Sequence, residues 1–192
     1  FPYDKVLADY LDGRAKRPFE PSFPDDDAEY EQVITINLSE LEPQVVLPNK
    51  VAWNSKPISE VVGKRVDQAF IGSCANGRLS DFKIAADIVR GKRVAEGTRF
   101  IITPGSQDVM RRAVKAGYVE TLLEAGAVVT NSTCGACYGG HMGLLADGEV
   151  CITASTRNFK GRMGSASAEI YMGSPATVAA SGVSSMPRTR MA

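Results

Sequence analysis

Three cysteines lie in two short glycine-rich segments, and their spacing could serve metal chemistry. Cys134 and Cys137 form a C-x-x-C pair, and Cys74 lies upstream in GSCANG, just past a predicted strand. Thiolates bind zinc and iron–sulfur clusters. A cluster held by only three protein thiolates would leave one iron open to water or substrate, where it could act as a Lewis acid. These cysteines are therefore candidate ligands of a reactive metal centre.

The same residues allow other interpretations. A C-x-x-C pair alone is more often a redox pair or half of a zinc site, and His141, the only histidine, could complete a Cys₃His zinc site. A thioredoxin-like pair would open a helix after the first strand, whereas this pair comes late in the α/β pattern. Cys74 alone could be a buried thiol. Cys151, in the apolar run EVCITAS, is predicted to belong to the core.

Glycines and arginines near the cysteines add candidate binding groups. Glycines let backbone amides approach an anionic group closely, although tight turns would also require them. Arg157 and Arg162 lie in STRNFKGR. Guanidinium groups pair bidentately with carboxylates, so two of them beside a cationic metal would suit a di- or tricarboxylic acid, although solvated surface arginines are the commoner case. No Ser/His/Asp arrangement or phosphate-binding loop occurs, so hydrolase and kinase functions have no support.

Alternating strands and helices position these residues. The apolar pattern predicts, in chain order, a strand at 68–72, a helix at 79–91, a strand at 98–105, one or two helices at 106–126 and a strand at 127–130. This order predicts a layered α/β domain with a mainly parallel sheet, whose ligand sites lie beyond the carboxyl ends of the strands. The loops that carry Cys74 and Cys134 follow two of these strands, so we expect them to converge on one ligand.

The first third of the chain reads as a linking segment. A helix is predicted at 3–13, followed by an exposed connection rich in proline and aspartate. Alternating apolar residues in EQVITINLSEL (31–41) predict a half-buried strand, and residues 42–57 are expected to be irregular. We therefore divide the chain into three parts: a linking segment at 1–65, an α/β domain at 66–182, and a tail at 183–192 that need not be ordered.

Composition argues against several classes of function. Lys plus Arg (22) balance Asp plus Glu (22), so no net charge would attract nucleic acid or an anionic membrane. No apolar run approaches the roughly 20 residues of a membrane helix. Four cysteines are too few for a disulfide-dense secreted scaffold, which favours a reducing, cytoplasmic location. The chain begins with Phe1 rather than Met, so we expect it to be a piece of a longer protein.

Several separated motifs, in a fixed order, resemble those of the aconitase superfamily. They are GSCANGR (72–78), TCGACYGGHMG (133–143) and STRNFKGR (155–162). Three further motifs resemble the large subunits of the 3-isopropylmalate dehydratase and homoaconitase branch: LSELEP (38–43), KPISEV (56–61) and ITPGSQ (102–107). The resemblance covers residues 30–182 and implies a layered α/β/α iron–sulfur domain with a mainly parallel sheet.

The resemblance also implies a set of roles. Cys74, Cys134 and Cys137 would ligate three irons of a [4Fe-4S] cluster. Arg157 and Arg162 would bind substrate carboxylates. Ser73 and Asn76 would lie beside the cluster. Cys151 matches no ligand position. The implied reaction removes and re-adds water on a 2-hydroxy di- or tricarboxylic acid of the 3-isopropylmalate type, as in leucine biosynthesis. Homoaconitase, aconitate hydratase or a citramalate-type dehydratase are alternatives, and a cluster- or zinc-binding regulatory module is an alternative of another class.

The sequence departs from the family pattern in two ways. Thr156 replaces an asparagine that often precedes the arginine, and Ala75 replaces the usual threonine, so the hydrogen bonds around the cluster are in doubt. The family also carries catalytic residues in an N-terminal part and a base serine on a swivelling domain, often a separate small subunit. Neither is present here, so the catalytic residues are unknown in this chain. Alone, it is expected to bind a cluster poorly and to catalyse nothing without these partners.

Overall fold

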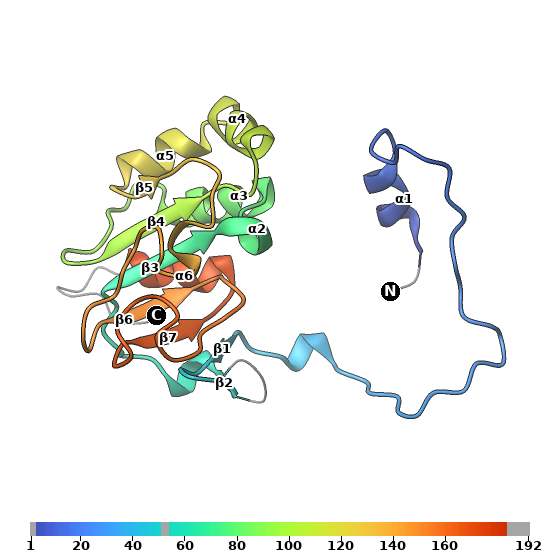
Figure 1. Ribbon diagram of the computed structural model, residues 1–192, viewed down its shortest axis with the longest axis horizontal. Coiled ribbons are helices and arrows are strands. Elements are labelled where there is room, and N and C mark those ends of the chain that lie inside the picture. The colour runs from blue at the N-terminus through green and yellow to red at the C-terminus, as the bar shows by residue number, and fades with distance from the viewer. Residues whose placement is uncertain (1–2, 51–53, 184–192) are drawn as a thin grey trace. The chain divides into compact units, whose positions relative to one another are not determined.

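The computed structural model describes residues 3–50 and 54–183 (Figure 1). The chain divides into two compact units, Phe1–Glu40 and Leu41–Ala192. In the first unit, α1 (Lys5–Leu11) is capped by the Asp4 side chain and forms the helix that the sequence predicts. The second unit begins upstream of residue 66, because residues 44–57 contribute two strands to its sheet.

A seven-stranded sheet forms the centre of the second unit, in the order β2-β1-β7-β6-β3-β4-β5. Its strands are β1 (Gln44–Val46), β2 (Ser55–Pro57), β3 (Gln68–Gly72), β4 (Arg99–Thr103), β5 (Val128–Val129), β6 (Val150–Thr153) and β7 (Glu169–Met172). The five strands from β7 to β5 run parallel, and β1 pairs antiparallel with both β7 and β2. The predicted α/β fold with a mainly parallel sheet is confirmed.

Short helices follow β3, β4 and β7. They are α2 (Ser73–Asn76), α3 (Leu79–Val89), α4 (Gln107–Lys115), α5 (Tyr118–Glu124) and α6 (Pro175–Gly182). The Ser106 side chain caps α4, and left-handed Gly117 separates α4 from α5, so the segment predicted as one helix or two forms two. Single 3₁₀ turns complete the set: η1 (Leu38–Glu40), η2 (Ile58–Glu60) and η3 (Gly135–Cys137).

Alternation along the strands gives the sheet two different faces. On β3, Ala69 and Ile71 pack into a core with residues of α3, α5 and α6, whereas Phe70 points to the opposite face. The second core contains Phe70, Ile101, Ala136, Leu145, Cys151, Met163, Ala168 and Ile170. Connecting segments 133–149 and 155–168 supply its outer residues. The segment with the C-x-x-C pair is therefore part of the packing over one face of the sheet.

Two predictions for the linking segment are wrong. Residues 31–41 form no strand, and Val33, Ile34 and Ile36 are 79%, 70% and 63% exposed. Alternation alone cannot form a ladder, and no strand is described within Phe1–Glu40 to pair with this segment. Residues 42–57, predicted to be irregular, instead contain β1 and β2, because the antiparallel pairing with β7 extends the sheet. The predicted tail lies almost wholly outside the described residues. Among those that are described, no helix is long and apolar enough to cross a membrane.

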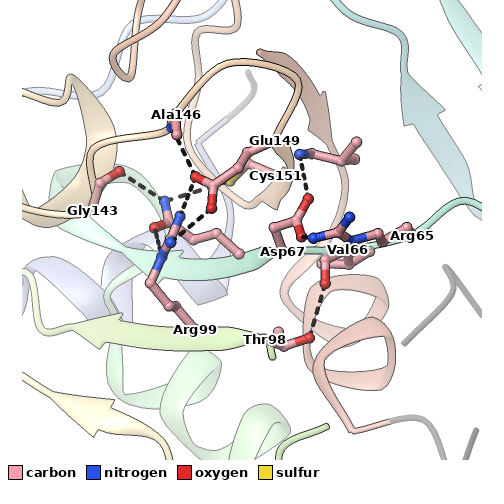
Figure 2. Close-up of polar contacts among 11 residues, drawn as sticks. Arg65, Val66, Asp67, Thr98, Arg99, Gly143, Ala146, Glu149 and Cys151 are labelled. Atoms are coloured by element: carbon pink, nitrogen blue, oxygen red, sulfur yellow. Dashed lines mark hydrogen bonds and ion pairs between the residues drawn. The ribbon is translucent and has the colours of Figure 1, made fainter. Parts of the chain in front are cut away.

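An ion pair joins β4 to the turn before β6, at the edge where the parallel strands begin (Figure 2). Both terminal nitrogens of Arg99 donate to the Glu149 carboxylate, at 2.9 and 2.6 Å. The same carboxylate accepts a hydrogen bond from the Ala146 backbone N–H at 2.9 Å. These bonds hold the start of β6 against the central strands.

This ion pair predicts an acid-sensitive part of the stability. Hydrogen bonding to Arg99 lowers the pKa of Glu149 below its usual value of 4.5. A carboxyl whose pKa is lower in the folded chain than in the unfolded chain stabilises the fold at pH values above its usual pKa. This contribution is lost as the pH falls through the pKa of the folded chain. Glu149→Gln is expected to lower the urea midpoint at neutral pH, and to lower it less at an acidic pH below the usual pKa of 4.5. The control is Glu124→Gln, on an exposed helix position; an equal loss for Glu149→Gln at both pH values would contradict the prediction.

Candidate metal centre

The loops after β3 and β4 pack tightly against each other at the carboxyl edge of the sheet. Gly72 ends β3 with φ +136°, and a Cβ there would overlap the carbonyl oxygen of Thr103 at the end of β4. The Gly105 N–H donates to the Gly77 carbonyl at 2.8 Å. Only glycine combines this backbone conformation with this close approach. The glycines of GSCANG therefore serve packing between the two loops.

The short helix α2 presents Cys74 at this edge. Ser73, the first residue of α2, directly precedes Cys74. It is 2% exposed and has a positive φ of 64°, so the chain turns sharply out of β3. Cys74 is exposed. The Asn76 side chain donates to the Ala154 carbonyl at 2.5 Å, which ties α2 to the end of β6. Cys74 thus lies on a turn that is fixed at both ends.

The turn η3 presents the other two cysteines. Cys134 is exposed and Cys137 is half-buried, and the Cys137 N–H donates to the Cys134 carbonyl at 3.1 Å. Gly135 between them has φ +56°, and a Cβ there would lie 2.5 Å from Thr103 Oγ1 and 3.0 Å from the Phe70 ring. The turn is therefore packed against β3 and β4. Because β3, β4 and β5 run parallel, the loop of Cys74 and the turn of Cys134 and Cys137 lie at the same edge.

The two candidate arginines differ in burial and in their contacts. Arg162 is half-buried; its Nε donates to the Cys137 carbonyl at 2.9 Å, and a terminal nitrogen lies 3.7 Å from the Cys137 sulfur. Its guanidinium also lies over the rings of Tyr138 and Phe159, 5.8 and 5.2 Å from their centroids. Arg157 is exposed, and within the described part of the chain it donates only to the neighbouring Thr156 carbonyl, at 2.6 Å. Arg162 thus joins the cysteine turn, whereas Arg157 projects from its loop.

The structure keeps all four cysteines as free thiols. Within residues 3–50 and 54–183, no group of three or more His, Cys, Asp or Glu side chains lies close enough together to hold a single metal ion. His141 is exposed. Cys151 is fully buried, and this burial raises the pKa of its thiol to about 12. Its predicted place in the core is confirmed, and the thiol remains protonated at neutral pH.

Comparisons with known proteins identify the family. The profile of the aconitase family (aconitate hydratase) matches residues 49–185. This chain belongs to the aconitase family. The family resemblance drawn from the separated motifs is thereby confirmed.

Among curated members, the chain is similar to 3-isopropylmalate dehydratase large subunits. It is 57% identical over 183 residues to the subunit from Mycolicibacterium smegmatis, covering 95% of this chain and 43% of the relative. The subunit from Aliarcobacter butzleri is 50% identical over 190 residues, with 95% and 44% covered. That from Halothermothrix orenii is 48% identical over 180 residues, with 94% and 43% covered. The chain thus spans less than half the length of these relatives.

Membership of the aconitase family implies an iron–sulfur cluster, and the donor set suits one. Three free thiols, two exposed and one half-buried, come from two loops at one edge of the sheet. Thiolates are the usual ligands of iron–sulfur clusters, and a cluster spreads its ligands over several irons instead of gathering them around one ion. The guanidinium of Arg162 adds positive charge beside Cys137, where it would offset part of the negative charge of a bound cluster.

Sequence reasoning missed Asn158, which lies between the two arginines. This side chain is fully buried, and its Nδ2 donates to the Leu47 carbonyl at 2.7 Å and to the Ile170 carbonyl at 3.1 Å. The backbone carbonyl of Asn158 accepts a hydrogen bond from the Asn49 N–H at 3.2 Å. Asn158 therefore fastens the arginine loop to β7 and to the end of β1. The motif STRNFKGR marks Asn158 as a candidate, but its role could not be predicted because the carbonyls that it binds lie far away in sequence.

These contacts predict a structural role for Asn158. Asn158→Asp keeps the size of the side chain but places an acceptor beside two carbonyl oxygens. Since buried carbonyls that lose their donor are costly, we expect the free energy of unfolding to fall by about 1–3 kcal/mol, measured by urea denaturation. Asn37→Asp, at an exposed position, should change it by less than about 0.5 kcal/mol. Similar small changes for both variants would show that Asn158 does not fasten the loop.

Proposed function

We propose that this chain is the cluster-binding part of a hydro-lyase large subunit that dehydrates and rehydrates a 2-hydroxy acid of the 3-isopropylmalate type. The observation that carries the proposal is the placement of Cys74 and the Cys134–Cys137 turn at one edge of a parallel sheet, with Arg162 bonded to Cys137. The similarity to 3-isopropylmalate dehydratase large subunits supports this substrate class.

In this proposal, Cys74, Cys134 and Cys137 hold a [4Fe-4S] cluster. When bound, the cluster supplies an iron without a protein ligand that acts as a Lewis acid toward the leaving hydroxyl. The exposure of Cys74 and Cys134 suits ligands that meet a cofactor at the surface of this unit. Cys151 takes no part, because its thiol is buried and protonated.

The remaining site residues orient the substrate and support the ligands. Arg162 keeps a fixed position, since the Cys137 carbonyl holds its Nε and two rings flank its guanidinium. Its remaining N–H groups can bind a substrate carboxylate. Arg157, exposed on the same loop, can turn toward a second carboxylate. Ser73 and Asn76 lie beside the cluster, where Asn76 steadies the turn that carries Cys74.

Catalysis would need parts that this chain does not supply. The relatives are more than twice as long as the matched region, which is consistent with further catalytic residues in an N-terminal part of the large subunit and in a small subunit with a swivelling domain. Residues 66–182 would form the cluster-binding domain, with β1 and β2 extending its sheet, and the rest of residues 1–65 would link it to the other parts. Four free thiols suit a reducing compartment, so we place the protein in the cytoplasm.

Anaerobic reconstitution with iron and sulfide tests the ligand set. The wild-type chain should turn brown and bind about four irons, weakly because its partners are missing, whereas Cys74→Ser, Cys134→Ser and Cys137→Ser should each lower the cluster yield strongly. Cys151→Ser is the matched control and should keep the wild-type yield. Visible spectra with iron and sulfide analysis give the result. A colourless wild-type chain that holds one zinc through His141 would refute the cluster.

Arginine variants test the substrate class in the assembled enzyme. After addition of the missing parts, Arg162→Lys is expected to lower kcat/KM for 3-isopropylmalate by about 100-fold, because a lysine cannot keep the bond to Cys137 while forming a forked pair with a carboxylate. Arg93→Lys, on an exposed loop, is the control. The chain alone should show no turnover. An Arg162→Lys enzyme within about twofold of the wild type would remove Arg162 from the substrate site.

A further inference from the structure

A row of side chains crosses three adjacent parallel strands beneath the segment that carries the C-x-x-C pair. Gln68, the first residue of β3, is in register with Arg99 of β4 on one side and with Cys151 of β6 on the other. Phe70 and Cys151 belong to the core on this face, so Gln68, two residues before Phe70, points to the same side. Gln68 is fully buried. A buried amide needs partners for both its nitrogen and its oxygen.

Gln68 finds these partners in β4 and in the connecting segment. Its Nε2 donates to the Gly143 carbonyl at 3.1 Å and lies 3.8 Å from the Cys151 sulfur, and its Oε1 accepts from Arg99 Nε at 3.1 Å. Figure 2 shows how the Arg99–Glu149 pair continues from there to the Ala146 N–H. The set of Gln68, Arg99 and Glu149, here termed the Gln68 brace, therefore holds the connecting segment at Gly143 and again at Ala146.

The bonded Gly143 lies directly against the cysteine turn. Gly143 has φ +62°, and a Cβ there would lie 2.5 Å from the Ala136 Cβ and 3.1 Å from Gln68 Nε2. Ala136 is fully buried and stands between Cys134 and Cys137. Gln68, Gly143 and Ala136 thus form a continuous line of contact from the central strand to the turn. Movement of Gly143 away from Gln68 would remove the support under Ala136.

We propose that Gln68 is a positioning residue for the Cys134–Cys137 turn. The proposal rests on the proposed function, in which these two thiols bind the cluster. Its physical basis is that the Gln68 amide has no good substitute. Without it, the Gly143 carbonyl and Arg99 Nε lose partners in a partly buried setting, and the space left by the fully buried Gln68 offers them no replacement. A turn that must present two thiolates needs neighbours that fix its position, as the supporting residues around metal sites generally do. An amide that served the sheet alone would have no bond to the connecting segment.

Cysteine alkylation in the full chain without cofactor tests this role. Gln68→Met keeps a similar volume and removes both hydrogen bonds. The half-buried Cys137 should then react with iodoacetamide about tenfold faster, because the loss of one or two hydrogen bonds raises the population of a locally open turn by that order. Cys74, on a separate turn, should keep its wild-type rate. Peptide mass spectrometry over a time course gives a rate for each thiol under native conditions.

Three further variants distinguish a specific effect of the Gln68 brace on the cysteine turn from a general loss of stability. Gln68→Glu can still accept from Arg99 but cannot donate to Gly143, so Cys137 should react nearly as fast as in Gln68→Met. Glu149→Gln weakens only the outer end of the brace and should give a smaller increase. It also carries the test if Gln68→Met does not fold. Ile152→Val, on the helix-covered face of the neighbouring strand, is the control and should leave the ratio of Cys137 to Cys74 rates unchanged.

The outcomes distinguish this inference from the proposed function. An unchanged Cys137 rate in both Gln68 variants overturns the inference, and so does an equal rise at Cys74. In reconstituted samples, Gln68→Met should lose its cluster to a chelator about tenfold faster than the wild type. A wild-type chain that forms no cluster counts against the proposed function alone, and the alkylation rates still decide whether Gln68 positions the turn.

Discussion

The pairing of β3 with β4 on one side and β6 on the other sets the position of every candidate site residue. All five residues of β3 are buried, and their alternation sends Ala69 and Ile71 into the helix-covered core and Phe70 into the second core. The parallel direction brings the loops that follow these strands to one edge. Ala69 and Ile71 thus anchor the helices, while Phe70 supports Gly135 in the cysteine turn. One strand therefore couples the stability of the fold to the geometry of the site.

The candidate site residues differ in exposure and in the number of contacts that hold them. Cys74 and Cys134 are exposed, whereas Cys137 is half-buried and in contact with Arg162. Arg162 is bonded and flanked by rings, whereas Arg157 projects from its loop. Under the proposed function, such a division would suit a site in which one side is already formed and the other is completed by additional parts. The limited coverage of the longer relatives agrees with this division.

Much of the α/β core could be predicted because its signals are local. The strand at 68–72 contains the apolar run Ala69–Ile71, and Gly117 marks the break between two helices. The strand predicted at 31–41 is wrong because alternation of apolar and polar residues is not sufficient: a strand also requires a partner strand. Gln68 and Asn158 could not be assigned from sequence, since each depends on backbone carbonyls that only long-range register brings close. The cysteines could be named by motif, but their different exposures follow from packing.

Within residues 41–50 and 54–183, no α-helix contributes to the core beneath the cysteine turn. Connecting segments cover Phe70, Ile101 and Ile170 there, and the same segments carry Cys134, Cys137 and Arg162. A chain that releases this cover to exchange metal also uncovers an apolar surface on a parallel sheet, which promotes aggregation. Under the proposed function, cofactor loading and protection against self-association would therefore depend on the same short stretch of chain, and selection on one would constrain the other.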